Sequence, residues 1–257
     1  MKQVIKRLLR RYGYRIEKNQ YALHQPPVSN SMAAVLARVS QHDFQPATVI
    51  DVGVATGTAP LYLAFPNAFH LLIEPLVEFF GPIQDLLRSY RGHYVPAAAG
   101  SVDGEITINV HADHLDGSSV LREEMGSEFD GSHRVVKLVR IDTLTAQMGL
   151  SGPYLLKVDT QGAELEVLEG SRQTLLDCEL VLLEVSLFEF MKGAPQFGDV
   201  IIYMKDHGFV VYDIYDGARR PLDGALGQLD LAFVKEQGIF RLDHRYATPE
   251  QWKQRAK

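Results

Sequence analysis

The sequence is poor in the features that mark secreted and membrane proteins. Its 257 residues include one cysteine, Cys178, which excludes a disulfide framework and a cysteine-based zinc site and favours a reducing compartment. No run of about 18 apolar residues occurs, so no transmembrane helix is predicted. Residues 1–18 also lack the apolar centre of a secretory signal. We therefore expect a cytoplasmic protein.

The remaining composition is that of an ordinary folded protein. Hydrophobic residues make up 46% of the chain and charged residues 23%, which excludes disordered and fibrous classes. A chain of this length buries enough surface to fold without disulfides or a structural metal. The formal net charge is −6, which argues against nucleic acid as a partner.

The charge is unevenly distributed along the chain. Residues 1–18 carry seven basic residues and one acidic residue, whereas the rest of the chain is strongly acidic. Two interpretations stay open. The segment is either a solvated amphipathic helix that packs through Val4, Ile5, Leu8 and Leu9, or a helix that makes a weak contact with an anionic surface.

From residue 46 onward, short apolar runs alternate with helical periodicities. Strands are predicted at 47–53, 69–75, 93–100, 105–110, 134–142, 154–159, 179–186, 209–215 and 227–235. Helices are predicted at 32–41, 60–65, 76–90, 142–148, 163–176 and 198–207. This alternation predicts an α/β fold with a mostly parallel sheet flanked by helices, ending in an antiparallel edge hairpin. We expect two parts: an N-terminal helical extension over 1–45 and a main domain over 46–257.

The first predicted strand ends in a turn of small residues, DVGVATG, over 51–57. Gly53 and Ala55 allow a ligand to approach the backbone closely, and Gly57 permits a tight turn into the next helix. Nucleotide-like ligands bind at such strand ends in parallel sheets. Glu74 ends the second strand, where its carboxylate can accept hydrogen bonds from a ribose diol.

The details of this turn distinguish two classes of ligand. A dinucleotide requires G-x-G-x-x-G so that its pyrophosphate can sit at the helix N-terminus. Here the pattern is G-x-A-x-G, and the acidic Asp51 stands where a pyrophosphate would be repelled. S-adenosyl-L-methionine carries a ribose, an adenine and a positive charge but no phosphate, so it is the predicted cofactor. An NAD(P)-dependent oxidoreductase on a related sheet is the alternative.

A second motif, LLKVDTQGAE over 155–164, is an apolar strand followed by a turn and a helix. Asp159 should lie at the carboxyl edge of the sheet, with Glu184 at the end of the next strand. Two carboxylates there can accept a proton or bind a substrate hydroxyl. The structural alternative is that Asp159 caps the following helix and Glu184 pairs with Lys157. We take Asp159, Lys157 and Glu184 as the candidate catalytic residues.

The long irregular stretch 111–133 lies between these motifs. Long loops in compact domains are often functional, and this one could cover the site as a lid. His114 with Asp113 and Asp116 suggests a metal site, but the pattern has no paired histidines at helical spacing and no downstream partner. No metal site is predicted.

The motifs follow one another in the order DVGVATG, IEP, VPAAAGSVDGEITI, VRIDTL, LLKVDTQGAELEVLEG and LLEVS. Over roughly residues 47–235 this order resembles the FkbM family of S-adenosylmethionine-dependent methyltransferases. The resemblance implies a class I methyltransferase fold with a Rossmann-like sheet of seven strands, the last of them antiparallel. It also implies methyl transfer to a hydroxyl group of a sugar, glycan or natural product. A catalytically inactive cofactor-binding module is a further alternative.

The resemblance also assigns positions to the site. It implies that Asp159 lies at the edge of the active site, and that the cofactor positions are Asp51, Gly53, Ala55, Gly57, Glu74, Ala98 and Ala99. Two departures from the family pattern stand out. Thr56 replaces the usual Asn of the first turn, and Thr160-Gln161 replaces the usual Val-Glu after the second strand motif.

Overall fold

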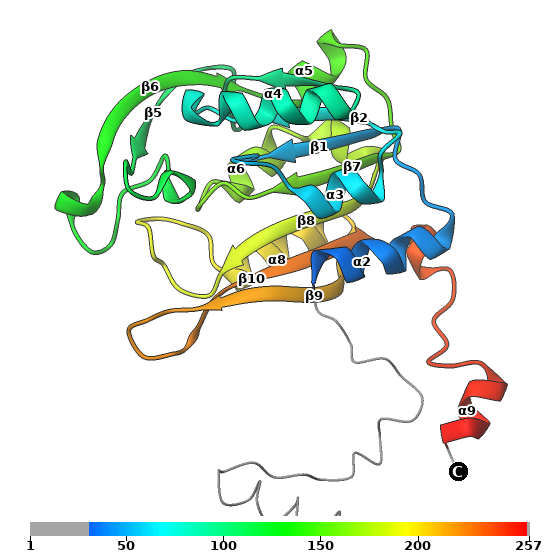
Figure 1. Cartoon of the computed structure of the whole chain (residues 1–257). Coiled ribbons are helices and arrows are strands. Elements are labelled where there is room, and N and C mark those ends of the chain that lie inside the picture. The colour runs from blue at the N-terminus through cyan, green and yellow to red at the C-terminus, as the bar shows by residue number, and fades with distance from the viewer. Residues whose placement is uncertain (1–30, 256–257) are drawn as a thin grey trace, which may run out of the picture. The chain divides into compact units, whose positions relative to one another are not determined.

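The computed structural model describes residues 31–255, which are organised around a seven-stranded sheet (Figure 1). The strand order is β3-β2-β1-β7-β8-β10-β9. The strands are β1 (Thr48–Val52), β2 (Phe69–Ile73), β3 (Gly92–Val95), β7 (Tyr154–Val158), β8 (Cys178–Ser186), β9 (Phe209–Arg219) and β10 (Leu226–Lys235). β10 runs antiparallel to both of its neighbours, β8 and β9, and all other pairs in this sheet are parallel. The predicted class I methyltransferase fold is therefore confirmed.

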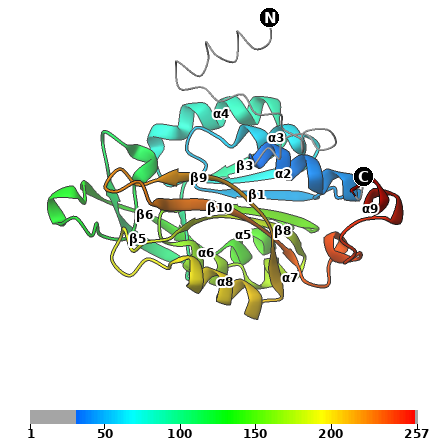
Figure 2. The ribbon, with the colours of Figure 1, turned by 90° about the horizontal axis from the view of Figure 1, so that it is seen from below.

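Helices cover both faces of this sheet (Figure 2). One face carries α2 (Met32–Val39), α3 (Ala59–Ala64) and α4 (Phe80–Ser89). The other carries α5 (Ile141–Gln147), α6 (Glu164–Glu169), α7 (Arg172–Leu176) and α8 (Phe197–Asp206). A last helix, α9 (Pro249–Arg255), follows the sheet. No helix within residues 31–255 is both long enough and apolar enough to cross a membrane.

Alternate residues of the central strands face two separate apolar layers. Ile50 of β1 packs with Leu156 of β7 in the layer under α6 and α8. Val49 packs with Leu155 in the layer under α2, α3 and α4. These strands are buried on both faces, as the continuous apolar runs in the sequence predict.

The helix α2 belongs to the same compact unit as the sheet. Ser31 caps it, and its Val35, Leu36 and Val39 are buried in the layer that contains Val49. Residues 31–45, which the sequence analysis assigns to the N-terminal extension, pack with the main domain. The predicted basic segment, residues 1–18, lies outside the described residues.

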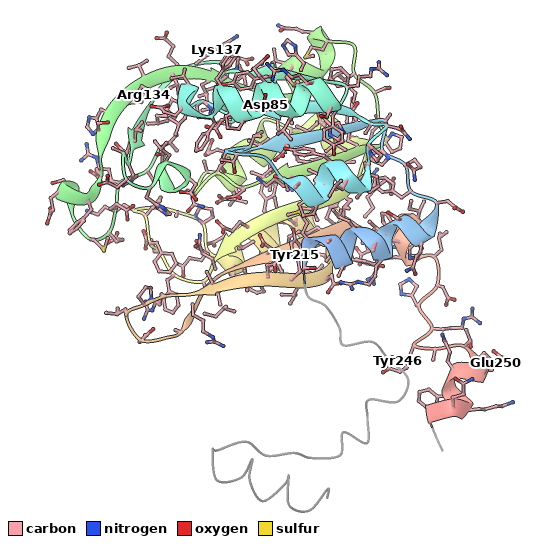
Figure 3. All side chains as sticks on the ribbon, in the orientation of Figure 1. Asp85, Arg134, Lys137, Tyr215, Tyr246 and Glu250 are labelled. Atoms are coloured by element: carbon pink, nitrogen blue, oxygen red, sulfur yellow. The ribbon has the colours of Figure 1, made fainter. Side chains whose placement is uncertain are left out.

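A second, three-stranded sheet stands beside the first. Its order is β4-β6-β5, with β4 (Ala98–Ala99), β6 (Ser132–Val139) and β5 (Gly104–Val110). The single strand predicted over 93–100 is thus split between two sheets. Arg134 of β6 (labelled in Figure 3) donates to both carboxylate oxygens of Glu78, at 2.8 and 2.7 Å. This pair ties the second sheet to the turn before α4.

The helix predicted over 163–176 is two helices, α6 and α7, separated at Gly170. The carbonyl of Gly170 accepts a hydrogen bond from the backbone of Asp142. A Cβ at Gly170 would lie 1.9 Å from the carbonyl oxygen of Gly100. The break therefore lets two backbone segments touch, which a longer helix would prevent.

We expect Gly170→Ala to lower the free energy of unfolding by about 1–3 kcal/mol, because the added methyl group forces the backbone of Gly100 away. Urea unfolding followed by circular dichroism measures the change. Gly81→Ala is the matched control, because nothing lies within 4 Å of its added Cβ. A stability of Gly170→Ala equal to that of the control would contradict the close approach.

Candidate active site

A cavity of about 330 Å³ opens at the carboxyl ends of β1, β2, β7 and β8. Its wall includes Gly53, Ala55, Glu74, Ala98, Ala99, Asp159 and Glu184. Seven of the candidate residues therefore line one cavity. In Figure 1 this is the edge on the left, where the ends of these strands meet.

The turn after β1 is shaped by residues with positive φ. Gly53, Ala55 and Gly57 have φ values of +72°, +46° and +109°. A Cβ at Gly53 would lie 1.8 Å from the carbonyl oxygen of Asp159. The close approach of the backbone at Asp159, directly after β7, therefore already requires glycine at position 53. Gly57 does not line this cavity; an added Cβ there would lie 2.7 Å from Leu86.

Glu74 joins the ends of β1 and β2. Its Oε2 accepts a hydrogen bond from the backbone N–H of Ala55 at 3.0 Å, and its Oε1 accepts one from that of Leu76 at 2.9 Å. The residue is only 5% exposed, and burial raises the pKa of its carboxyl despite these bonds. Each oxygen keeps a lone pair for a ligand. This carboxylate is therefore a rigid acceptor for two hydroxyl groups.

The neighbouring wall is apolar and made of small side chains. Ala97, Ala98 and Ala99 line it together with Ile73 and Phe79. Such a surface suits a flat aromatic ring, because the small side chains leave room for it beside Glu74. The cavity thus combines an apolar slot with a diol acceptor, which is the combination a nucleoside requires.

The irregular stretch that the sequence predicts over 111–133 forms the opposite wall. Residues 114–120 line the cavity. Ser119 holds them in place, because its hydroxyl donates to the carbonyl of Gln161 at 2.7 Å and its backbone pairs with Asn109. Within residues 31–255, no three histidine, cysteine or acidic side chains are grouped to hold a metal ion.

Asp159 and Lys157 stand at the end of β7 in different environments. The Asp159 side chain is 41% exposed and reaches the cavity, whereas the Lys157 side chain is 8% exposed. Lys157 Nζ lies 3.2 Å from Asp51 Oδ1 and 3.5 Å from Asp159 Oδ2, and it donates to the carbonyl of Gly53 at 2.8 Å. Burial would lower the pKa of Lys157, but the two carboxylates outweigh it and raise the pKa to about 12.

Asp51, which the sequence analysis places among the cofactor positions, does not line the cavity. Its side chain is fully buried, and its carboxylate faces Lys157 and the hydroxyl of Tyr62 instead of the cavity. The repulsion of a pyrophosphate expected from Asp51 is therefore largely cancelled by Lys157. The structural alternative for Glu184 is also wrong, because Lys157 pairs with Asp51 and Asp159. Nor does Asp159 cap the next helix, whose N-cap is Ala163 and has no side-chain hydrogen bond.

Glu184 lies near Asp159 and is held by two glutamines, one of which belongs to β10. Its Oε2 accepts from Gln161 Nε2 at 2.8 Å and from Gln228 Nε2 at 2.9 Å. Burial and the negative charges of Asp159 and Asp230 raise the pKa of Glu184 to about 8. Burial and the charge of Asp159 raise that of Asp230 to about 7. Glu184 therefore keeps its proton to a higher pH than an ordinary glutamate does.

Sequence reasoning missed Gln161, Gln228 and Asp230. Asp230 stands directly opposite Glu184 in the register between β10 and β8. The missing signal was the direction of β10. Because this strand is antiparallel, its first residues lie at the edge where the parallel strands end. The polar residues that alternate with leucine in GQLDL could therefore have been assigned to the site.

A second cavity of about 380 Å³ adjoins the first and shares Asp159 and Glu184 with it. It lies between the start of α3 and strands β8, β9 and β10, and Asp216 and Asp230 also line it. The turn between β9 and β10 approaches the loop after β8 nearby, where Arg220 lies 3.8 Å above the ring of Phe188. The two shared carboxylates therefore stand between a nucleoside-shaped cavity and an acidic one.

Comparison with known proteins gives a family match over most of this region. A family model described as "Methyltransferase FkbM domain" matches residues 51–211, more than half of the chain. No curated protein is significantly similar to the chain in sequence.

Several solved structures are distantly similar. Magnesium protoporphyrin IX methyltransferase from Synechocystis PCC 6803, with bound SAM, aligns over 91% of this chain and 96% of its own, at a TM-score of 0.46 and 13% identity. Precorrin-6y C5,15-methyltransferase from Geobacter metallireducens GS-15 aligns over 84% and 94%, at 0.40 and 11%. A SAM-dependent methyltransferase from Agrobacterium tumefaciens aligns over 80% and 61%, at 0.43 and 10%. These similarities are too weak to indicate an acceptor.

The raised pKa of Glu184 predicts a pH-dependent stability. Its carboxyl titrates near 4.5 in an unfolded chain and near 8 in the folded one. The folded state therefore holds the extra proton between these values, and the free energy of unfolding falls as the pH rises through them. We expect the melting temperature of wild type to fall more than that of Glu184→Gln between about pH 5 and about pH 8.5.

Glutamine at position 184 can still accept the hydrogen bonds of Gln161 and Gln228 but cannot lose a proton. The exposed Glu105→Gln is the control, and its melting temperature should follow that of wild type at every pH. Parallel curves for wild type and Glu184→Gln would show that Glu184 titrates normally.

Proposed function

The chain belongs to the FkbM methyltransferase family, and from that membership we propose that it methylates a hydroxyl oxygen of a sugar, glycan or natural product. It is a methyltransferase, and its cofactor is S-adenosyl-L-methionine. The family favours this activity over a nicotinamide-dependent oxidation. One observation carries the proposal: two cavities meet at Asp159 and Glu184.

The first cavity fits the nucleoside part of the cofactor. Glu74 would accept the two ribose hydroxyls, because both of its oxygens are already oriented by backbone N–H groups. The slot beside Ala98 and Ala99 would hold the adenine. When bound, S-adenosyl-L-methionine supplies a methyl group on a sulfonium centre, whose leaving group is neutral and needs no acid.

Asp159 is the proposed proton acceptor. An alcohol is a weak nucleophile near neutral pH, and a positioned base accelerates such a reaction by typically 10²–10⁴-fold. Asp159 reaches both cavities, and its Oδ2 lies 3.5 Å from Lys157 Nζ. Glu184, whose pKa is raised, would instead donate a hydrogen bond to the molecule that receives the methyl group.

The second cavity is the proposed acceptor site. Its carboxyl groups can bind hydroxyl groups as hydrogen-bond acceptors, which suits a neutral, hydroxyl-rich molecule. A strongly anionic acceptor would be repelled by Asp216 and Asp230. A screen of neutral glycosides and hydroxylated natural products with a radiolabelled methyl donor tests the proposal, and transfer to nitrogen or carbon alone would contradict it.

We expect Glu74→Ala to weaken the binding of S-adenosylhomocysteine by about ten- to a hundredfold, because charge-assisted bonds to the ribose are lost. Titration calorimetry with the full chain measures this affinity. Glu105→Ala, an exposed residue of β5, is the matched control and should bind like wild type. An unchanged affinity in a folded Glu74→Ala variant would remove the ribose role of Glu74.

We expect Asp159→Asn to bind S-adenosylhomocysteine within a few-fold of wild type and to transfer methyl groups at least about tenfold more slowly. The loss should appear in kcat, measured with the first acceptor that the screen identifies. The exposed Asp113→Asn controls for loss of an acidic residue. Equal rates in Asp159→Asn and wild type would assign the base to another residue.

A further inference from the structure

A buried polar cluster of Asp51, Tyr62 and Lys157 lies behind the wall of the first cavity. Asp51 and Lys157 stand opposite each other in the register between β1 and β7. The Asp51 side chain is 0% exposed and that of Lys157 is 8% exposed. Neither residue lines the first cavity, whereas Lys157 lines the second. Direct contact with the cofactor is therefore not the role that their geometry supports.

Lys157 connects two parts of the site that belong to different strands. Its Nζ donates to the carbonyl of Gly53, in the turn that lines the first cavity, at 2.8 Å. The same Nζ lies 3.5 Å from the carboxylate of Asp159, which reaches both cavities. One ammonium group therefore sets the distance between the turn after β1 and the proposed base after β7.

Asp51 and Tyr62 hold this ammonium group in place. Asp51 Oδ1 lies 3.2 Å from Lys157 Nζ, while its Oδ2 accepts from the hydroxyl of Tyr62. That hydroxyl in turn accepts from the backbone N–H of Thr58, just before α3, at 3.1 Å. The ring of Tyr62 packs edge-on against His70. The cluster thus fixes both ends of the turn between β1 and α3.

Charge balance alone does not explain this arrangement. A buried ion pair can often be replaced by apolar residues of similar volume without loss of stability, because desolvation offsets much of its attraction. A pair that only filled the interior would not need its ammonium group directed at the carbonyl of Gly53. The contacts with Gly53 and Asp159 are the part that an apolar substitute cannot reproduce.

We propose that Lys157 is a positioning residue that holds the cofactor turn and the carboxylate of Asp159 in register, with Asp51 as its counter-charge. The inference rests on the proposed function for the roles of the turn and Asp159. It goes further in assigning Lys157 an effect on cofactor binding that is separable from its contribution to folding.

The test compares stability with affinity in charge-balanced variants. Lys157→Met alone leaves Asp51 buried without its partner and should melt far below wild type. The double variant Asp51→Asn/Lys157→Met removes both charges and should recover most of the melting temperature. We expect it nevertheless to bind S-adenosylhomocysteine about tenfold more weakly, because the carbonyl of Gly53 is released.

Two further variants complete the set. In Asp51→Asn/Lys157→Gln the side-chain amide can still donate to the carbonyl of Gly53. This variant should therefore bind S-adenosylhomocysteine more tightly than Asp51→Asn/Lys157→Met. It also tests the inference if the methionine variant does not fold. Lys137→Met, on β6 (Figure 3), removes an exposed lysine and should leave both stability and affinity unchanged.

The outcomes separate this inference from the proposed function. Wild-type affinity in both double variants would show that Lys157 only neutralises Asp51, and failure of both to fold would show that its role is in folding; either result overturns the inference. Failure of wild type itself to bind S-adenosylhomocysteine would instead overturn the cofactor assignment. Binding by wild type without methylation of any hydroxyl would overturn the acceptor chemistry and leave the affinity comparison valid.

Discussion

The arrangement of this site depends on a buried ion pair between neighbouring parallel strands. Asp51 and Lys157 are in register at the ends of β1 and β7, so each neutralises a charge that the low-dielectric interior would otherwise disfavour. Asp51 lies two residues before Gly53 of the turn, and Lys157 lies two residues before Asp159. The pair therefore supports both functional groups from behind the wall of the first cavity. Ala55 is the non-glycine residue with a positive φ in this turn, and the hydrogen bond from its backbone N–H to Glu74 holds it there.

Most of the fold could be predicted because its strands are buried on both faces. Their apolar runs are continuous, and the helical periodicities between them identify a parallel sheet. The second sheet could not be predicted from the sequence. The predicted strand 93–100 breaks at Pro96 because Ala98 and Ala99 pair with β6, which is distant in sequence. The break at Gly170 was missed for a similar reason. It is caused by contact with Gly100, which is 70 residues away in sequence and leaves no local signal.

The sequence places a residue at the candidate site when that residue directly follows a buried strand. Glu74 and Asp159 follow buried strands directly, so the topology places both at the cavity. Asp51 and Lys157 also stand near strand ends, but their side chains point into the interior, and a single sequence does not reveal that difference. Gln161 and Gln228 were missed because amides carry no charge and give no chemical signal until the carboxylate between them is located.

The antiparallel direction of β10 has a consequence for how such enzymes diversify. It brings the turn between β9 and β10 to the same edge as the acidic cavity, although the turn belongs to no core element. Residues can be inserted in an exposed turn with little effect on the strands that flank it. A lineage with this topology could therefore change the molecules it accepts by altering the length of one hairpin, while the cofactor cradle three strands away stayed the same.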